Sequence, residues 1–280
     1  MSLRIVVDST ADMPEELKSQ FTIVPLNVNF GDEQYIDGVT IDHATFYQKL
    51  EGCSKLPTTS QPSPDAYMRV FEEAKQAGDT LVVLCVSSGI SGTYQSAMIA
   101  AQEYPDNVFV VDTLHVANAF GILAEYALNL ARQGKSAQEI VDAVIAERSH
   151  VELFALVDTL EYLQKGGRLS KTAAVAGTLL SLKPIVCIRD GVLSVLGKAR
   201  GMKQGQQLLA KEMNAADIDF DKPYLMAYSG LTDEKLQKFL QDNGAVFAKG
   251  VQDVRCVQLC SVVGTHAGPG AVVAAFFKKH

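Results

Sequence analysis

The chain has 280 residues, of which 48% are hydrophobic and 20% charged, and it carries a formal net charge of −7. This length exceeds the ~100–200 residues of a typical domain and predicts two domains with a cleft between them. The negative charge argues against a nucleic-acid-binding surface, and no apolar run reaches the ~18–20 residues of a membrane span. Because the N-terminus also lacks a signal-peptide pattern, we expect a cytoplasmic protein.

The first half of the chain alternates between apolar runs and helical patterns. Strands are predicted at residues 4–7, 23–30, 81–86 and 108–111, and helices at residues 14–19, 42–50, 65–77 and 92–104. This alternation is typical of an α/β domain with a mainly parallel sheet. Ligands bind beyond the carboxyl ends of such strands, and small polar residues stand there at 8–10, 87–93 and 112–113.

A pair of long predicted helices, residues 117–132 and 137–149, ends the first half. Gly134 separates them, and Ser136 is the expected cap of the second helix. We therefore place a domain boundary here, with an N-terminal α/β domain at 1–150 and a C-terminal α+β domain at 151–280. In the second half, strands are predicted at residues 153–157, 185–189, 192–197, 224–229, 254–263 and 271–277, and helices at 202–215 and 233–243. A hairpin turn is predicted at residues 189–192.

The loop at residues 87–93 follows an apolar strand and leads into a predicted helix. Ser91 can cap this helix, which leaves the backbone N–H groups of Gly92, Thr93 and Tyr94 without intrahelical partners. A carboxylate or phosphate could accept those hydrogen bonds and meet the positive end of the helix dipole. The simpler interpretation is that Ser91 only caps its own helix, with water at the other donors.

Two further segments carry candidate binding residues. Residues 57–64 predict a stiff, hydroxyl-rich loop that could present Thr59 and Ser60 to a ligand, although a capped turn before the next helix explains the same pattern. Residues 264–270 place three glycines around His266, which permits close backbone approach and a fixed imidazole that could donate to a carboxylate. A structural role for His266 in this loop is the alternative. Arg168 follows a predicted helix end, where a basic residue meets the dipole.

Catalytic and cofactor motifs are weak or absent in the sequence. Ser91, His266 and Asp8 or Asp112 could form a hydrolase triad, but Thr93 stands where the G-x-S-x-G elbow requires its second glycine. The chain has no nucleotide-binding fingerprint. Its five cysteines and five histidines lack zinc spacing, so we expect no metal site. Two hypotheses remain at this point: a binding protein without its own turnover, and a small hydrolase or transferase that uses Ser91 and His266.

Five segments, in order along the chain, resemble a known set of motifs. They are residues 8–14 (DSTADMP), 59–63 (TSQPS), 87–96, 160–170 and 264–270. As an ordered set they resemble the DegV family of bacterial fatty-acid-binding proteins, which includes the FakB-type subunits of fatty acid kinase. The resemblance spans essentially the whole chain. It implies a two-domain DegV-like fold that encloses one long-chain fatty acid, with the carboxylate near the domain junction and the tail in an apolar tunnel.

The same resemblance implies roles for individual residues. The fatty-acid carboxylate would be bound by Thr59, Ser60, Ser91, Gly92, Thr93 and His266. Arg200 would serve the docking of, or phosphotransfer by, a separate ATP-dependent kinase subunit that converts the acid to an acyl-phosphate. The chain would then be a lipid-binding protein without a cofactor and not an enzyme in itself.

Overall fold

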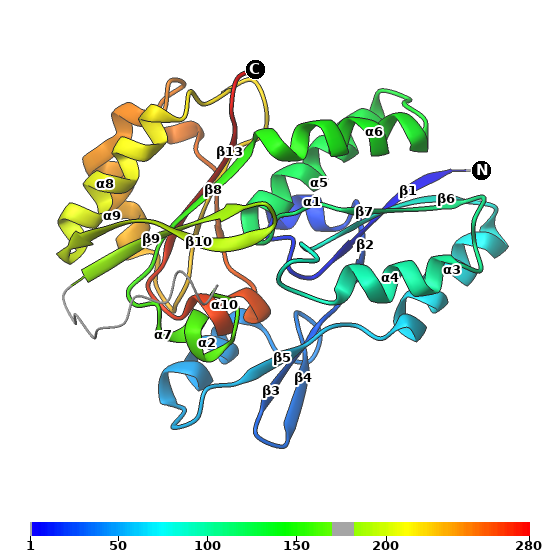
Figure 1. Ribbon diagram of the computed structural model, residues 1–280, viewed down its shortest axis with the longest axis horizontal. Helices are drawn as coiled ribbons and strands as arrows, with labels where there is room; N and C mark the ends of the chain where they lie inside the picture. The colour runs from blue at the N-terminus through cyan, green and yellow to red at the C-terminus, as the bar shows by residue number, and fades with distance from the viewer. Residues whose placement is uncertain (1, 170–181) are drawn as a thin grey trace.

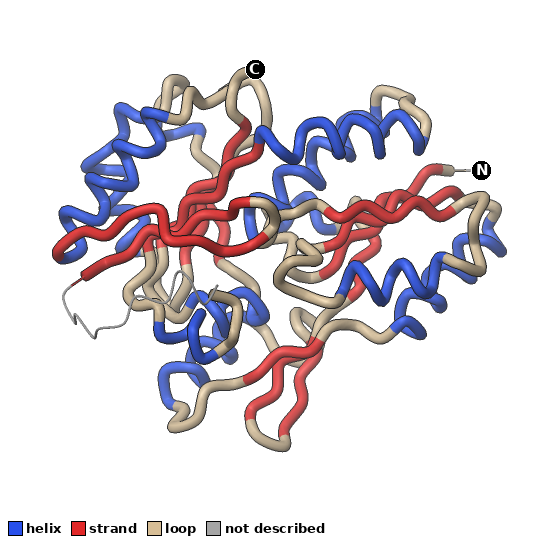
Figure 2. Tube along the Cα trace, viewed as in Figure 1, coloured by secondary structure: helices blue, strands red, loops and turns tan. Residues whose placement is uncertain are grey.

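The computed structural model describes residues 2–169 and 182–280, and it has a mixed α/β fold built around three sheets (Figure 1). A four-stranded sheet forms from the first half of the chain, a six-stranded sheet from the second half, and a three-stranded sheet lies beside both (Figure 2). None of the described helices is long and apolar enough to cross a membrane.

The four-stranded sheet is parallel throughout, as the strand–helix alternation predicts. Its order is β2-β1-β6-β7, with β1 Leu3–Asp8, β2 Thr22–Val24, β6 Thr80–Cys85 and β7 Val108–Asp112. The short helix α1 (Glu15–Lys18) connects β1 to β2. Helices α3 (Pro64–Ala77) and α4 (Thr93–Ala101) pack on one face, and α5 (Ala117–Arg132) and α6 (Ala137–Glu147) pack on the other. The central strands β1 and β6 are mostly buried because helices cover both faces, whereas the edge strands β2 and β7 are partly exposed.

Local signals explain where several of these helices begin and end. Ser136 and Glu139 form the reciprocal capping box of α6, and Gly134 before it has a φ of 80° that favours glycine. Ser63 caps α3, which begins with Pro64 and ends at Gly78 in the left-handed conformation. These bounds agree with the sequence patterns to within one or two residues.

The six-stranded sheet is mixed and has the order β10-β9-β8-β13-β11-β12. Its strands are β8 Val151–Leu156, β9 Leu182–Arg189, β10 Val192–Arg200, β11 Leu225–Tyr228, β12 Cys256–Gln258 and β13 Val272–Phe277. Strands β9 and β10 form the predicted hairpin. One face of the sheet packs against α8 (Gly201–Ala215) and α9 (Glu234–Asn243), and the other faces α5 and the first half of the chain.

Alternate residues of each central strand therefore enter different cores. Phe154 and Leu156 of β8 pack with the α8 and α9 side, whereas Leu153 and Ala155 belong to a core that also contains Ile5 and Phe120 from the first half. Both halves share this apolar core, so the packing does not separate them at residue 150. The domain boundary there stays a prediction.

The three-stranded antiparallel sheet, in the order β4-β3-β5, corrects two expectations. Residues 23–30 form two strands rather than one: β2 in the parallel sheet and β3 (Asn27–Phe30) in the small sheet, which pairs with β4 (Glu33–Ile36). Pro25 lies between them and has no N–H to continue a ladder. Residues 58–60, predicted as loop, form β5 (Thr58–Ser60).

A third correction concerns the predicted strand at residues 254–263. Only β12 is extended there, and the chain then enters the helix α10 (Ser261–Ala267). A short apolar run does not by itself distinguish a strand from a buried helix. Helices α2 (His43–Gly52) and α7 (Glu161–Lys165) pack around α10, so it is buried by tertiary contacts.

Candidate functional site

A cavity lies between the two halves of the protein, and together with the open space at its mouth it holds about 770 Å³ free of protein atoms. Its walls come from the six-stranded sheet, from the segments that follow β1, β2 and β6 of the four-stranded sheet, from β5 and from α10. Five polar side chains line it, those of Thr10, Thr59, Ser91, Arg168 and His266, and its other lining residues are apolar.

The apolar wall follows from the alternation of the six-stranded sheet. Leu153 and Ala155 of β8 project into the cavity, and Val186 of β9 and Val273 of β13 stand beside Ala155 in register. Val116, at the start of α5, comes from the opposite half. Most of the wall is thus aliphatic, and the few polar groups belong to the sequence motifs. Such a lining suits an elongated apolar ligand with one polar end.

Thr59 and His266 form a hydrogen-bonded pair at this cavity, although 207 positions separate them in the sequence. Thr59 Oγ1 lies 2.8 Å from His266 Nε2. Burial, assisted by the positive charge of Arg168, lowers the pKa of His266 to about 4. The ring is therefore neutral at pH 7. Its Nδ1 atom is buried and has no hydrogen-bond partner among the described residues.

His266 lies in the last turn of α10, and not in a loop as the glycine pattern suggested. The glycines nevertheless allow the close approach that was expected of them. Gly264 faces α2, where an added Cβ would stand 2.6 Å from the hydroxyl of Tyr47. Gly166, after α7, lies against the imidazole, and a Cβ at Gly166 would collide with Nδ1. Gly166 thus leaves room for the histidine ring, and Gly264 lets α10 approach α2.

The lowered pKa of His266 predicts a specific response to acid. Between its ordinary pKa of 6.5 and about 4, the unfolded chain binds a proton here that the folded chain does not. The contribution of His266 to stability is complete above pH 6.5 and falls as the pH falls toward 4. We expect the Tm difference between the parent and a His266→Gln variant to shrink between about pH 7 and about pH 4.5.

Asp8 has the opposite effect on the pH dependence, since burial raises its pKa to about 6. Its contribution is present in both the parent and the His266→Gln variant, so it cancels in the comparison of the two proteins. A Tm difference that stays constant across this pH range, or grows toward acid, would contradict the assignment of a buried neutral ring.

Ser91 lies at the cavity, but the helix after it begins later than predicted. The cap residue of α4 is Gly92, and Ser91 Oγ accepts a hydrogen bond from Thr93 N at 3.3 Å and lies 2.8 Å from Thr93 Oγ1. Gln61 covers Gly92, because its Nε2 donates to the Gly92 carbonyl at 3.1 Å. The amide of Thr93 is therefore already hydrogen bonded, and the predicted set of three free amides is not what the structure shows.

Four of the predicted site residues do not line the cavity. Thr93 is fully buried beneath Ser91, and Gly92 lies under Gln61. Ser60 follows Thr59 in β5, and consecutive strand residues point to opposite faces. Arg200 lies at the end of β10, where it is exposed and directly precedes α8.

Arg168 is a site residue that the sequence analysis explained only as a helix-end cation. It follows α7 and reaches across to the loop before α4, where Nε donates to the Ile90 carbonyl at 3.3 Å and an Nη donates to the Gly166 carbonyl at 2.6 Å. Its guanidinium thus lines the cavity close to both His266 and Ser91. The motif at residues 160–170 includes Arg168, but only the tertiary structure shows that its side chain lines the cavity.

The described residues do not assemble a hydrolase triad. His266 Nε2 pairs with Thr59 and not with Ser91, and Ser91 Oγ is engaged by Thr93. The two candidate aspartates are also occupied elsewhere. Asp8 accepts bonds from Thr10 and from Val86 N, and Asp112 accepts them from the backbone of the 87–93 loop and of Leu114. In this arrangement no base is hydrogen bonded to Ser91 to activate it as a nucleophile.

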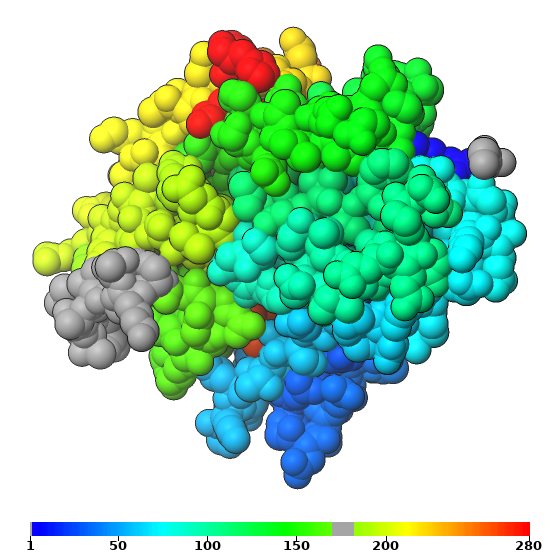
Figure 3. Space-filling model, turned by 45° about the vertical axis from the view of Figure 1, so that its right-hand side comes forward, coloured from blue at the N-terminus to red at the C-terminus, as the bar shows by residue number. Residues whose placement is uncertain are grey.

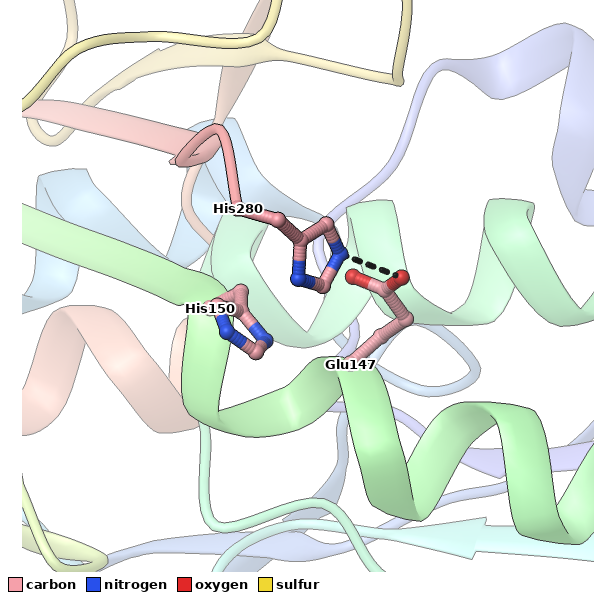
Figure 4. Close-up of side chains that lie close together, drawn as sticks. All are labelled: Glu147, His150 and His280. Carbon is pink, nitrogen blue, oxygen red and sulfur yellow. Dashed lines mark hydrogen bonds and ion pairs between the residues drawn. The ribbon is translucent and has the colours of Figure 1, made fainter.

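Glu147, His150 and His280 form a separate group of side chains where α6 ends and the last strand returns beside it (Figure 4). His280 Nε2 lies 3.1 Å from one Glu147 oxygen, and the ammonium of Lys222 lies 2.8 Å from the other. Lys222 thus already supplies a cation to this carboxylate. We interpret the group as a surface ion-pair network that ties the C-terminal residues to α6.

The polar residues Thr59, Ser91, Arg168 and His266 of the cavity are partly exposed, whereas the apolar strand residues of its wall are buried. Figure 3 shows atoms in the orange-red of this segment at the bottom of a narrow gap between the green surface of residues around α7 and the blue-to-cyan surface of residues around β5. Four of the five polar side chains of the cavity come from these same segments and from the loop before α4, and the fifth, Thr10, follows β1 and is buried. The polar end of the cavity therefore lies toward the surface, and the apolar end extends into the shared core.

Comparisons with known proteins agree with this architecture. A family model described as an uncharacterised protein of the DegV family matches residues 2–279. A DegV domain-containing protein of Caldanaerobacter subterraneus subsp. tengcongensis is 36% identical over 283 residues and covers 99% of both chains. A Thermus thermophilus DegV family protein, described by its fatty-acid binding, is 32% identical with a TM-score of 0.87 over 99% of this chain and 100% of that one. A fatty-acid-binding DegV family protein of Streptococcus agalactiae is 29% identical with a TM-score of 0.86 and full coverage of both chains.

Proposed function

This chain belongs to the DegV family, and on that premise we propose that it binds one long-chain fatty acid in the cavity between its two halves. The observation that carries the proposal is the composition of that cavity. Aliphatic side chains form most of its wall, and the polar groups of Thr59, Ser91, Arg168 and His266 come from segments near the surface. The two fatty-acid-binding relatives that share this fold support the choice of ligand.

The hydroxyl groups can both donate to a carboxylate. A neutral His266 that carries its proton on Nε2 donates to Thr59 Oγ1, which leaves the Thr59 hydrogen free for the ligand. Ser91 Oγ accepts from the amide of Thr93, and its own hydrogen is available to the ligand when the Thr93 hydroxyl is the donor in the 2.8 Å contact between the two hydroxyl groups. Arg168 adds a positive charge beside them. A carboxylate leaves water only where such donors replace its hydration, and hydrogen bonds to a charged group contribute about 1.5–3 kcal/mol each.

The acyl tail would supply most of the affinity. Each methylene that moves from water to the apolar wall contributes about 0.8 kcal/mol. The residues that bind the carboxylate then determine the orientation and the class of the ligand. The length of the cavity limits the length of the acyl chain. The proposal requires no metal and no cofactor besides the fatty acid.

Presentation of the bound acid to a separate ATP-dependent kinase is the second part of the proposal. Its support is the motif resemblance to fatty acid kinase subunits, together with the exposed Arg200 between Lys198 and Lys203 in an otherwise acidic chain. Arg200 lies outside the cavity, so it suits contact with a partner rather than ligand binding. A cytoplasmic location completes the proposal, since all five cysteines are free, as in reducing compartments.

Native mass spectrometry of the freshly purified protein, followed by solvent extraction, tests the ligand directly. We expect a mass increment of one long-chain fatty acid that is reduced in Ser91→Ala and His266→Ala variants. A protein that arrives empty and takes up neither palmitate nor oleate would overturn the proposal.

The kinase step has its own experiment. With the ATP-binding subunit of a fatty acid kinase and ATP, the Arg200→Ala variant should retain bound palmitate but form less acyl-phosphate than the parent. Loss of palmitate binding in this variant would contradict the assignment of Arg200 to the partner.

A further inference from the structure

Helix α10 carries His266, yet its beginning is held by two carboxylates from the other half of the chain. Asp12 Oδ1 accepts a hydrogen bond from Cys260 N at 2.8 Å, and Asp37 Oδ1 accepts one from Ser261 N at 3.1 Å. The two contacts span 248 and 224 positions of sequence. They bind consecutive amides at the point where the chain turns into the helix.

Both aspartates are buried at some cost. Asp12 is 5% exposed and Asp37 is 3% exposed, and the Oδ2 atom of each has no partner among the described residues. Burial raises the pKa of Asp12 well above its usual value, against the hydrogen bond from Cys260. Buried carboxyl groups of this kind are retained where they satisfy unpaired backbone donors. A helix N-terminus is such a place, because its first amides have no partner within the helix.

A helix of seven residues depends on external contacts for its position. Besides the aspartates, the hydroxyl of Tyr47 donates to the Leu259 carbonyl at 3.0 Å, and Gly264 packs directly against α2. Within the helix, Thr265 Oγ1 donates to the Ser261 carbonyl at 2.8 Å. From Ser261 to His266 the helix rises only about 7.5 Å, so a shift at its start displaces the imidazole by a similar amount.

We propose that Asp12 and Asp37 are positioning residues for the head-group site, which anchor the start of α10 so that His266 remains within hydrogen-bond distance of Thr59. The inference rests on the proposed fatty-acid function and deepens it. The aspartates do not line the cavity. They act through the helix, by joining the half of the chain that supplies Thr59 and Ser91 to the segment that supplies His266.

The test compares two ligands that share a tail, palmitate and 1-hexadecanol, so that head-group effects separate from general loosening. Asp37→Leu removes the acceptor, and Asp37→Asn keeps an acceptor oxygen of the same shape. We expect Asp37→Leu to weaken palmitate binding by about tenfold more than hexadecanol binding, and Asp37→Asn to stay within about threefold of the parent. In a His266→Ala background, Asp37→Leu should change the palmitate affinity by less than about twofold.

Ser261→Pro breaks the same hydrogen bond from the donor side, since proline lacks an N–H and is tolerated at the first helical position. Ser261→Pro takes the place of Asp37→Leu if that variant fails to fold. It should likewise weaken palmitate binding more than hexadecanol binding. Equal weakening for both ligands, or an undiminished effect in the His266→Ala background, would overturn the positioning role. A parent protein that binds no palmitate would instead refute the proposed function.

Discussion

Replacement of Ala155 by phenylalanine is expected to abolish high-affinity fatty-acid binding while the fold persists. Ala155 lies in the middle of β8, projects into the cavity and is flanked in register by Val186 and Val273. A benzyl group there occupies the space that the tail requires. If three or four methylenes lose their burial, the loss is about 3 kcal/mol, or at least about 100-fold in affinity.

Isothermal titration with palmitate measures this change, and thermal denaturation shows whether the protein is still folded. Overpacking itself costs about 1–3 kcal/mol of stability, so a lower Tm is expected alongside the lost binding. Ala77→Phe, at the exposed end of α3, adds the same side chain outside the cavity and should bind like the parent. Undiminished palmitate affinity in a folded Ala155→Phe protein would place the tail elsewhere.

Replacement of Thr59 by valine should produce the second-largest loss, and this loss should depend on the head group. Valine keeps the shape of threonine but removes the hydroxyl that bonds to His266 Nε2 and that would donate to the carboxylate. One lost bond to a charged group corresponds to about 1.5–3 kcal/mol, or about 10–150-fold in palmitate affinity. The substitution also leaves the buried His266 Nε2 without a hydrogen-bond partner, which lowers the stability of the protein.

Thr58→Val is the matched control for this prediction. Thr58 precedes Thr59 in the same strand, carries the same side chain and is exposed on the other face. It should bind palmitate as tightly as the parent. The head-group assignment requires that Thr59→Val weaken palmitate binding more than hexadecanol binding. If the two ligands lose affinity equally, or if Thr58→Val has the same effect, Thr59 does not contact the carboxylate.

The agreement between sequence and structure is best where the signals are local. The alternation of strands and helices predicted the parallel sheet, and the capping residues located the ends of α3 and α6. Disagreement begins where one pattern fits two structures. Residues 254–263 are apolar enough for a strand, but a helix begins at Ser261, where the amides of Cys260 and Ser261 donate hydrogen bonds to Asp12 and Asp37.

The candidate site shows the same limit at the level of single side chains. The motifs named Thr59, Ser91 and His266, and all three line the cavity, although their role toward a carboxylate stays a proposal. The same motifs could not separate Thr59 from Ser60, because the face of a strand residue is decided by the pairing of β5 with β3. The sequence explained Arg168 only as a basic residue at a helix end, and the structure shows that it donates a hydrogen bond to the Ile90 carbonyl.

The sequence by itself therefore determined the α/β class, most element bounds and the family, because hydrophobic periodicity, caps and ordered motifs are properties of neighbouring residues. Only the tertiary structure decided which polar side chains meet at one cavity. The Thr59–His266 pair joins residues 207 positions apart, and the amides at the start of α10 donate to carboxylates more than 200 positions away. Such contacts form only when strand register and helix packing bring distant segments together, and no local pattern encodes that geometry.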